Sequence, residues 1–281
     1  MENINYPIIY SKITKGLSVK VKDIFDRRFG IKSGKTETLE SIGKDLGITR
    51  ERVRQIQEAG FNFIRKGNKE TLDKIFQSFS YYFDSNGGFK REDIVLSDLG
   101  GKKNEPYVLF FLNIGSNNFF RVCGKKDYNY FWSTAHDSGL EIKETLSSLV
   151  QKIKNHGRIL DNNELFGSFA NKYNLENKSL KSYLEISKNI QENKEGKFGV
   201  IDWPEIKPRG VRDKAFLVFK KEQKPLHFRK ITELIDTLEY NSSIKKAHPQ
   251  TVHNELIKDP RFVLVGRGTY ALRDWGYVPG T

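Results

Sequence analysis

Residues 38–66 of the chain read TLESIGKDLGITRERVRQIQEAGFNFIRK, and this stretch decides the fold of the N-terminal part. Leu39, Ile42 and Leu46 recur at the spacing of one face of a helix. Gly47 breaks that helix, and a longer stretch with helical periodicity follows after a short turn. A short helix, a turn of three to four residues and a longer second helix are typical of a helix-turn-helix. The sequence therefore predicts this motif here.

A threonine precedes each of the two expected helices. Thr38 and Thr49 are of a residue type that caps helix N-termini by accepting a hydrogen bond from a backbone N–H group, and we expect Ile48 to fill the turn. The buried stripe of the second helix is expected to consist of Val53, Ile56, Gly60, Phe63 and Ile64. The opposite face would hold Arg50, Glu51, Arg54, Gln55 and Glu58.

This exposed face carries the side-chain types that read base edges in the major groove. Arg pairs with guanine, Gln pairs with adenine, and Glu accepts a hydrogen bond from cytosine. The first two turns of a recognition helix are the part that enters the groove. A solvated charged face on a structural helix is the alternative interpretation. The DNA-binding residues predicted in this segment are Thr49, Arg50, Glu51, Arg52, Arg54, Gln55 and, at the helix end, Lys66.

The segment from about residue 17 to residue 66 resembles region 4 of bacterial primary sigma factors, chiefly through the RFG run at 28–30 and the TRERVRQI run at 49–56. The resemblance implies a domain that reads the promoter −35 element and docks on the flap of RNA polymerase. It implies base contacts by Arg50, Glu51, Arg54 and Gln55 and a backbone contact by Arg52. No other stretch resembles sigma region 2, so a stand-alone promoter-opening sigma factor is not expected.

The rest of the chain contains a weak internal repeat. Trp132, Trp203 and Trp275 are 71 and then 72 residues apart. Each ends a β-rich or aromatic stretch that follows a glycine-containing turn, where a hairpin needs positive φ angles. The turns contain Gly124, Gly196 and the pair Gly266 and Gly268. Upstream of these stretches, helical periodicity recurs at 70–83, 140–155 and 211–223.

Three helices followed by a two-stranded hairpin form the winged-helix pattern. The fold class that we predict is mainly α with small β-hairpins, built from tandem helix-turn-helix and winged-helix domains. The expected domains are a helix-turn-helix at 1–68 and winged-helix domains at 69–134, 135–204 and 205–281. A chance recurrence of three tryptophans is the alternative.

The last of these domains resembles the HARE-type helix-turn-helix, a winged helix known from the delta subunit of bacterial RNA polymerase and from chromatin and restriction-linked proteins. The resemblance covers about 211–275 and is carried by the PLHFRKI and FVLVGRGTYAL runs. Pro249 suits the first position of the third helix, and Phe262 and Leu264 should alternate opposite Tyr270 and Leu272 in a half-buried hairpin. Arg267 at the hairpin tip is a candidate phosphate or minor-groove contact, or else an ordinary exposed turn residue. The family surface binds protein as well as DNA.

The charge distribution favours a polyanionic partner. Lys and Arg number 48 against 35 Asp and Glu, which gives a net charge of +13. Residues 1–68 and 205–281 each carry an excess of +6, whereas 69–204 carry +1. Double-stranded DNA is therefore the expected partner, and the two ends of the chain are the expected contacts.

Several other functions are not expected. The single cysteine, Cys123, excludes a disulfide framework. No apolar run approaches the roughly 18 residues of a membrane span, and no signal peptide is evident, so we expect the bacterial cytoplasm or nucleoid. Asp127, Glu141 and Lys143 mimic a nuclease site, but the last two read as helical. We expect no enzyme, cofactor, metal or small-molecule substrate.

Two functions therefore stay open. The first is a sequence-specific transcription regulator with −35-like promoter recognition, with RNA polymerase as a further partner. The alternative is a polymerase-associated or DNA-defence-linked protein whose winged helices mainly bind protein.

Overall fold

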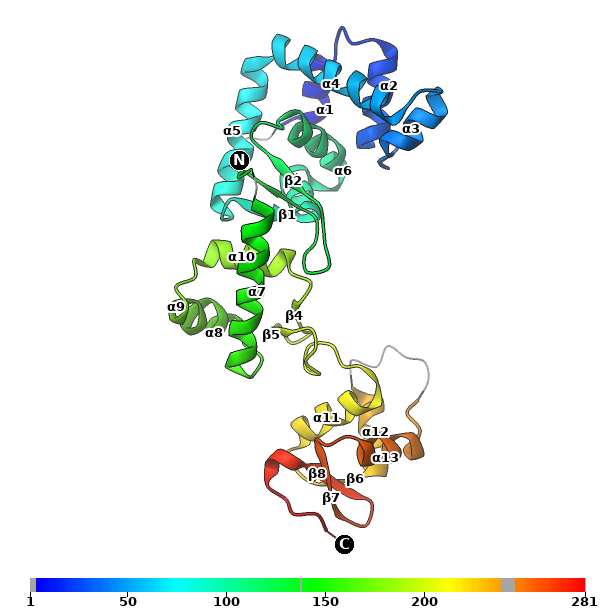
Figure 1. Ribbon diagram of the computed structural model, residues 1–281, viewed down its shortest axis with the longest axis vertical. Coiled ribbons are helices and arrows are strands. Elements are labelled where there is room, and N and C mark those ends of the chain that lie inside the picture. Colours follow the sequence, from blue (N-terminus) through cyan, green and yellow to red (C-terminus); the bar gives the residue numbers. More distant parts are fainter. Residues whose placement is uncertain (1–3, 137, 239–245, 281) are drawn as a thin grey trace. The chain divides into compact units, whose positions relative to one another are not determined.

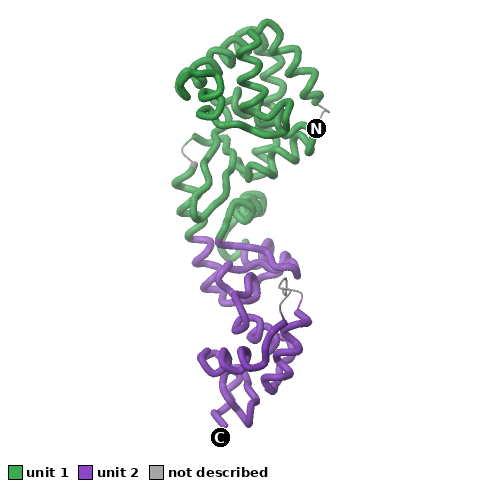
Figure 2. Tube along the Cα trace, turned by 90° about the vertical axis from the view of Figure 1, so that its right-hand side faces the viewer, with its two compact units in different colours: residues 1–147, 170–188 green, residues 148–169, 189–281 purple. Residues whose placement is uncertain are grey.

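The computed structural model describes residues 4–136, 138–238 and 246–280. The chain divides into two compact units, residues 1–147 with 170–188 and residues 148–169 with 189–281 (Figure 2). Helices and short strands alternate along the described chain (Figure 1). The mainly α fold with small β-hairpins is confirmed.

The first unit begins with a helical segment that contains the helix-turn-helix. Its helices are α1 (Tyr6–Ile13), α2 (Val19–Phe29), α3 (Leu39–Leu46) and α4 (Arg50–Gly67). Thr38 and Thr49 cap α3 and α4, as expected: their side chains accept hydrogen bonds from the backbone N–H groups of Ser41 and Arg52, both at 3.1 Å. Helices α3 and α4 are thus the two helices of the predicted motif.

The next segment has a winged-helix order of elements. It consists of α5 (Lys69–Ser85), β1 (Phe89–Arg91), α6 (Glu92–Ile114), β2 (Phe120–Val122) and β3 (Phe131–Ser133). Gly101 interrupts α6 with φ 60° and ψ 166°, so that α6 is in effect two helices. The three antiparallel strands lie in the order β1-β3-β2.

The third segment repeats this order with a reduced sheet. It consists of α7 (Ser138–His156), α8 (Asn162–Glu164), the π-helical turn η1 (Leu165–Phe169), α9 (Ala170–Lys172), α10 (Asn177–Ile186), β4 (Ile190–Glu192) and β5 (Phe198–Val200). A single bridge from Leu160 to Phe198 takes the place of the first strand.

The last segment has the full set of elements again. It consists of α11 (Gly210–Glu222), β6 (Leu226–His227), α12 (Phe228–Thr237), α13 (Pro249–Lys258), β7 (Phe262–Gly266), β8 (Thr269–Leu272) and the 3-10 turn η2 (Arg273–Trp275). Its strand order, β6-β8-β7, matches that of β1-β3-β2. Pro249 is the first residue of α13, as expected.

The largest core joins the helix-turn-helix segment to the segment that follows it. Phe110 of α6 lies within ring-to-ring distances of 5.0–5.7 Å of Tyr10, Phe25, Phe29 and Phe61, which come from α1, α2 and α4. This core crosses the expected domain boundary at residue 68, so the first two segments pack as one body.

Three expectations about single residues were wrong. Phe63 is not part of the buried stripe of α4, because it is 51% exposed and Phe61 is buried in its place. Gly124 does not have a positive φ; the residues from 123 to 130 form a long connection, and a side chain at Gly124 would lie 3.0 Å from the backbone nitrogen of Tyr130. Leu264 is 39% exposed, so β7 does not bury the alternate residues that we expected.

The exchange between Phe61 and Phe63 can be tested directly. Phe61→Ala should lower the free energy of unfolding by about 3–5 kcal/mol, because it leaves a cavity among packed rings. Phe63→Ala should cost about 1 kcal/mol or less, because much of that ring is already in water. Urea denaturation of the two variants measures the difference. Equal losses would contradict the position that the structure gives to Phe61.

Candidate nucleic-acid interface

The turn between α3 and α4 is held by a close backbone approach. Ile48 donates its backbone N–H to the carbonyl oxygen of Gly43 at 2.9 Å. A Cβ atom at Gly43 would lie 2.7 Å from the carbonyl oxygen of Ile48, so only glycine fits at this point of α3. Gly47 adopts the left-handed conformation, with φ 64°, that ends α3. These two glycines set the angle at which α4 leaves the turn.

The inner face of the motif is a small apolar core. Ile24, Ile42 and Val53 are fully buried and come from α2, α3 and α4. Because Val53 points inward, the residues on either side of it in the sequence point outward. The predicted residues Thr49, Arg50, Glu51, Arg52, Arg54 and Gln55 are all exposed and lie together on the first two turns of α4.

The exposed side chains are paired with one another. Arg54 donates two hydrogen bonds to the carboxylate of Glu51, at 2.8 and 2.9 Å. These bonds lower the pKa of Glu51 below its ordinary value, so the carboxylate is charged at neutral pH. Arg52 donates to the side-chain oxygen of Gln55 at 3.2 Å. Exposed pairs of this kind contribute little to stability, so the side chains can exchange their partners for DNA groups.

Two further arginines belong to the same region. Partial burial, together with the nearby guanidinium groups of Arg121 and Arg50, lowers the pKa of Arg28. Arg28 donates to the carbonyl oxygen of Glu37 at 2.9 Å. Positive charge therefore gathers from α2, α4 and β2, beside a helix N-terminus that itself attracts anions. Our sequence reasoning missed Arg28 and Arg121, because nothing in the sequence links β2 to the helix-turn-helix.

The far end of α4 is anchored in the protein. Arg65 donates to the carbonyl oxygen of Ile114 at 2.9 Å, to the hydroxyl of Ser116 at 3.0 Å and to the carboxylate of Glu58 at 2.8 Å. Its neighbour Lys66 is exposed. At 1.5 Å per residue, Lys66 is about 24 Å along the helix from Arg50. The structure therefore separates Lys66 from the other predicted residues of α4.

Arg267 lies in the second unit. It is exposed in the turn between β7 and β8. Gly268 has φ 69°, and a Cβ atom there would lie 2.6 Å from the Nε2 atom of His227. The Gly268 carbonyl oxygen also accepts a hydrogen bond from the backbone N–H of Phe228 at 2.9 Å. The turn that presents Arg267 is thus fixed against the start of α12.

The other motifs do not form a site of their own. Glu141 and Lys143 lie on α7, as expected, and not on the strand that a nuclease site would need. Within residues 4–136, 138–238 and 246–280, no three His, Cys, Asp or Glu side chains gather where a metal ion could bind. None of the helices in these same ranges is long and apolar enough to cross a membrane.

Comparison with known families identifies both ends of the chain. Residues 15–66 match the family model for sigma-70, region 4. Residues 210–275 match the family model HARE-HTH, which describes a helix-turn-helix domain of ASXL and restriction endonuclease proteins. Both families are DNA-binding domains and not enzymes, which supports a DNA-binding regulator.

Several sigma factors resemble the first of these segments. RNA polymerase sigma factor SigA of Nostoc sp. is 35% identical over 65 residues, which is 23% of this chain and 17% of that protein. RNA polymerase sigma factor sigB of Arabidopsis thaliana is 37% identical over 66 residues, 24% of this chain and 11% of that protein. SigA of a Bacillus species is 37% identical over 60 residues, 21% of this chain and 16% of that protein. The match thus spans less than a fifth of each relative. No solved structure matches significantly.

The chain therefore carries a sigma-70 region 4 helix-turn-helix at residues 15–66 and a HARE-type helix-turn-helix at residues 210–275.

Proposed function

We propose that the protein is a sequence-specific transcription regulator that reads a −35-like promoter element through α4. The observation that carries this proposal is the division of α4 into two faces. Its first two turns expose the base-reading side chains, while Val53 and Phe61 are buried on the protein side.

The proposal gives each residue a role that its position allows. Arg50 and Gln55 would contact base edges from the first two turns of α4, with Glu51 and Arg54 beside them. Arg52 and the capping residue Thr49 would contact the backbone near the N-terminus of α4. Lys66 and, in the second unit, Arg267 would contact phosphates only. The expected partner is double-stranded DNA, and a regulator of this kind would act in the bacterial cytoplasm or nucleoid.

Packing within the chain favours this function over protein docking by the same domain. The apolar side chains of α2 and α4 that face away from the DNA-reading surface are covered by α1 and α6, chiefly by Tyr10 and Phe110. The apolar face of the helix-turn-helix is therefore already occupied. A contact with RNA polymerase, which the sigma-factor relatives suggest, would have to use another surface of this chain.

The four-part division into 1–68, 69–134, 135–204 and 205–281 also remains a proposal. The recurring order of helices and strands supports it. The shared core of the first two parts means that they would act as one body.

The reading role of α4 predicts a loss of sequence preference. Arg50→Ala and Gln55→Ala should each cost roughly 1–3 kcal/mol of binding free energy on a duplex selected by the wild-type chain, and much less on a scrambled duplex. Affinities for the two duplexes provide the measurement. If each variant weakened both duplexes equally, α4 would not read bases, and the protein-binding alternative would be favoured.

The contribution of phosphate contacts predicts a strong dependence on salt. Each neutralised phosphate contributes about −0.9 to the slope of log K against log salt concentration. Lys66→Ala should therefore weaken all duplexes alike and make the slope shallower by about one unit. A titration of wild-type binding against salt concentration, repeated with this variant, measures both effects. A wild-type slope near zero would argue against DNA as the partner.

A further inference from the structure

The helices that could enter a DNA groove differ in how far they are exposed. In the helix-turn-helix this helix is α4, and in each winged-helix segment it is the helix before the hairpin: the C-terminal half of α6, then α10, then α13. Helix α4 exposes a polar face along its first two turns. The exposed residues of α13 are Pro249, Gln250, Thr251, Asn254, Ile257 and Lys258.

The C-terminal half of α6 has no such face. No residue from 107 to 115 is exposed, and Val108, Phe110 and Phe111 are fully buried. Lys102 and Lys103 are exposed, but they lie at the start of this half. The helix is enclosed because α1 and α2 pack against it. A groove in DNA could not reach the middle of this helix without separating that core.

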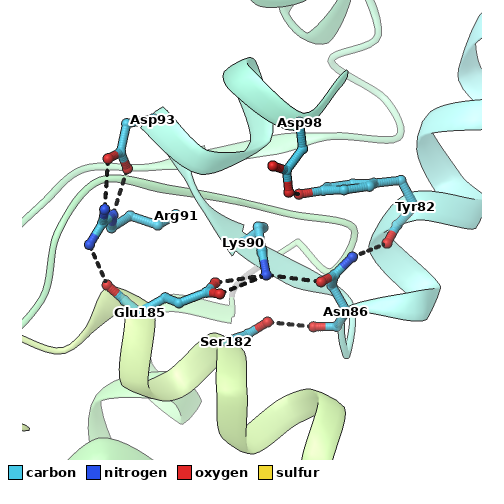
Figure 3. A network of polar contacts seen from close by, with 8 residues as sticks. All are labelled: Tyr82, Asn86, Lys90, Arg91, Asp93, Asp98, Ser182 and Glu185. Carbon is cyan, nitrogen blue, oxygen red and sulfur yellow. Dashed lines mark hydrogen bonds and ion pairs between the residues drawn. The ribbon is translucent and has the colours of Figure 1, made fainter. Parts of the chain in front are cut away.

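Helix α10 is enclosed in a different way, by polar contacts with α5 and β1 (Figure 3). The Lys90 ammonium group, whose side chain is only 3% exposed, lies 2.8 and 2.9 Å from the two carboxylate oxygens of Glu185 on α10. It also donates to the side-chain oxygen of Asn86 at 2.9 Å. Arg91 donates to the carbonyl oxygen of Glu185 at 3.1 Å, and the Ser182 hydroxyl donates to the carbonyl oxygen of Asn86 at 2.6 Å.

A glycine allows this close approach. A Cβ atom at Gly87, in the turn between α5 and β1, would lie 2.6 Å from the hydroxyl oxygen and 2.8 Å from the Cα atom of Ser179 on α10. Next to these polar contacts, Tyr183 of α10 packs on Phe89 of β1 with 4.8 Å between ring centroids. A buried ammonium group is tolerated only with charged and hydrogen-bonded partners, so α10 is needed to satisfy Lys90.

We propose that the C-terminal half of α6 and the helix α10 are internal docking helices, and that DNA contact is confined to the two ends of the chain, through α4 and through α13 with the Arg267 turn. The part of this inference that concerns DNA rests on the proposed function. The docking of α10 does not, and can be tested without DNA. The nearly neutral charge of residues 69–204 agrees with this division of roles.

Docking is tested with two adjacent glycines. Gly87 and Gly88 both have positive φ, at 79° and 86°, so alanine strains the backbone at either position. At Gly88 the nearest atom to a new Cβ would be the Thr134 hydroxyl oxygen at 3.5 Å, which is an ordinary contact. Gly87→Ala should therefore speed amide hydrogen exchange in α10 at least tenfold more than Gly88→Ala does. Equal rates in α10 would overturn the docking role, whether or not the chain binds DNA.

Confinement of DNA contact to the ends is tested with charge reversals of equal size. Lys102→Glu with Lys103→Glu, Lys178→Glu with Lys181→Glu, and Lys258→Glu with Arg267→Glu each change the net charge by −4. The probe is a 40-base-pair random duplex at low salt. The first two pairs, on α6 and α10, should leave its dissociation constant within about twofold, and the third should raise it roughly tenfold or more.

Two outcomes would overturn the confinement. One is an effect of either middle pair as large as that of the C-terminal pair, and the other is a C-terminal pair without effect while Arg50→Glu still weakens binding. If the wild-type chain binds no duplex at all, the proposed function fails, and the exchange experiment alone decides the role of α10.

Discussion

The packing of Phe110 against the aromatic rings of α1, α2 and α4 is the interaction on which the rest of the first unit depends. Its ring lies 5.0 Å from that of Tyr10, 5.3 Å from that of Phe25 and 5.7 Å from that of Phe61. The contact fixes one face of the helix-turn-helix in the protein interior. The opposite face, at the start of α4, is left to the solvent and carries the side chains that suit DNA. An aromatic core and a polar reading surface are in this way two sides of the same helix.

The same arrangement of helices and strands serves different purposes along the chain. The sheets β1-β3-β2 and β6-β8-β7 have the same strand order, and the third segment reduces its first strand to one bridge. The helix before each hairpin differs in its surroundings. It is enclosed by apolar side chains in α6 and by the ion pair of Lys90 and Glu185 in α10, whereas α13 retains exposed polar residues. A fold-level match therefore does not by itself assign DNA reading to each copy.

Local signals in the sequence predicted the helix-turn-helix well. Thr38, Gly47 and Thr49 act within one turn of their own positions, so their effect can be read from the adjacent residues. The choice between Phe61 and Phe63 could not be made in this way, because both lie close to the apolar side of α4 and the partner, Phe110, is distant in sequence. The same holds for Lys90, which looks like a surface lysine until α10 supplies Glu185. The four-part division and the roles of the DNA-binding residues remain predictions.

The central claim is that the start of α4 meets DNA. It is tested most directly by photocrosslinking, with a photoreactive phenylalanine analogue placed at Gln55 or, as a control, at Tyr81, which is 70% exposed on α5 outside the helix-turn-helix. Irradiation of the full chain with duplex DNA should yield a protein–DNA crosslink from position 55 and little from position 81. Equal crosslinking from the two positions, or crosslinking from position 81 alone, would contradict the account.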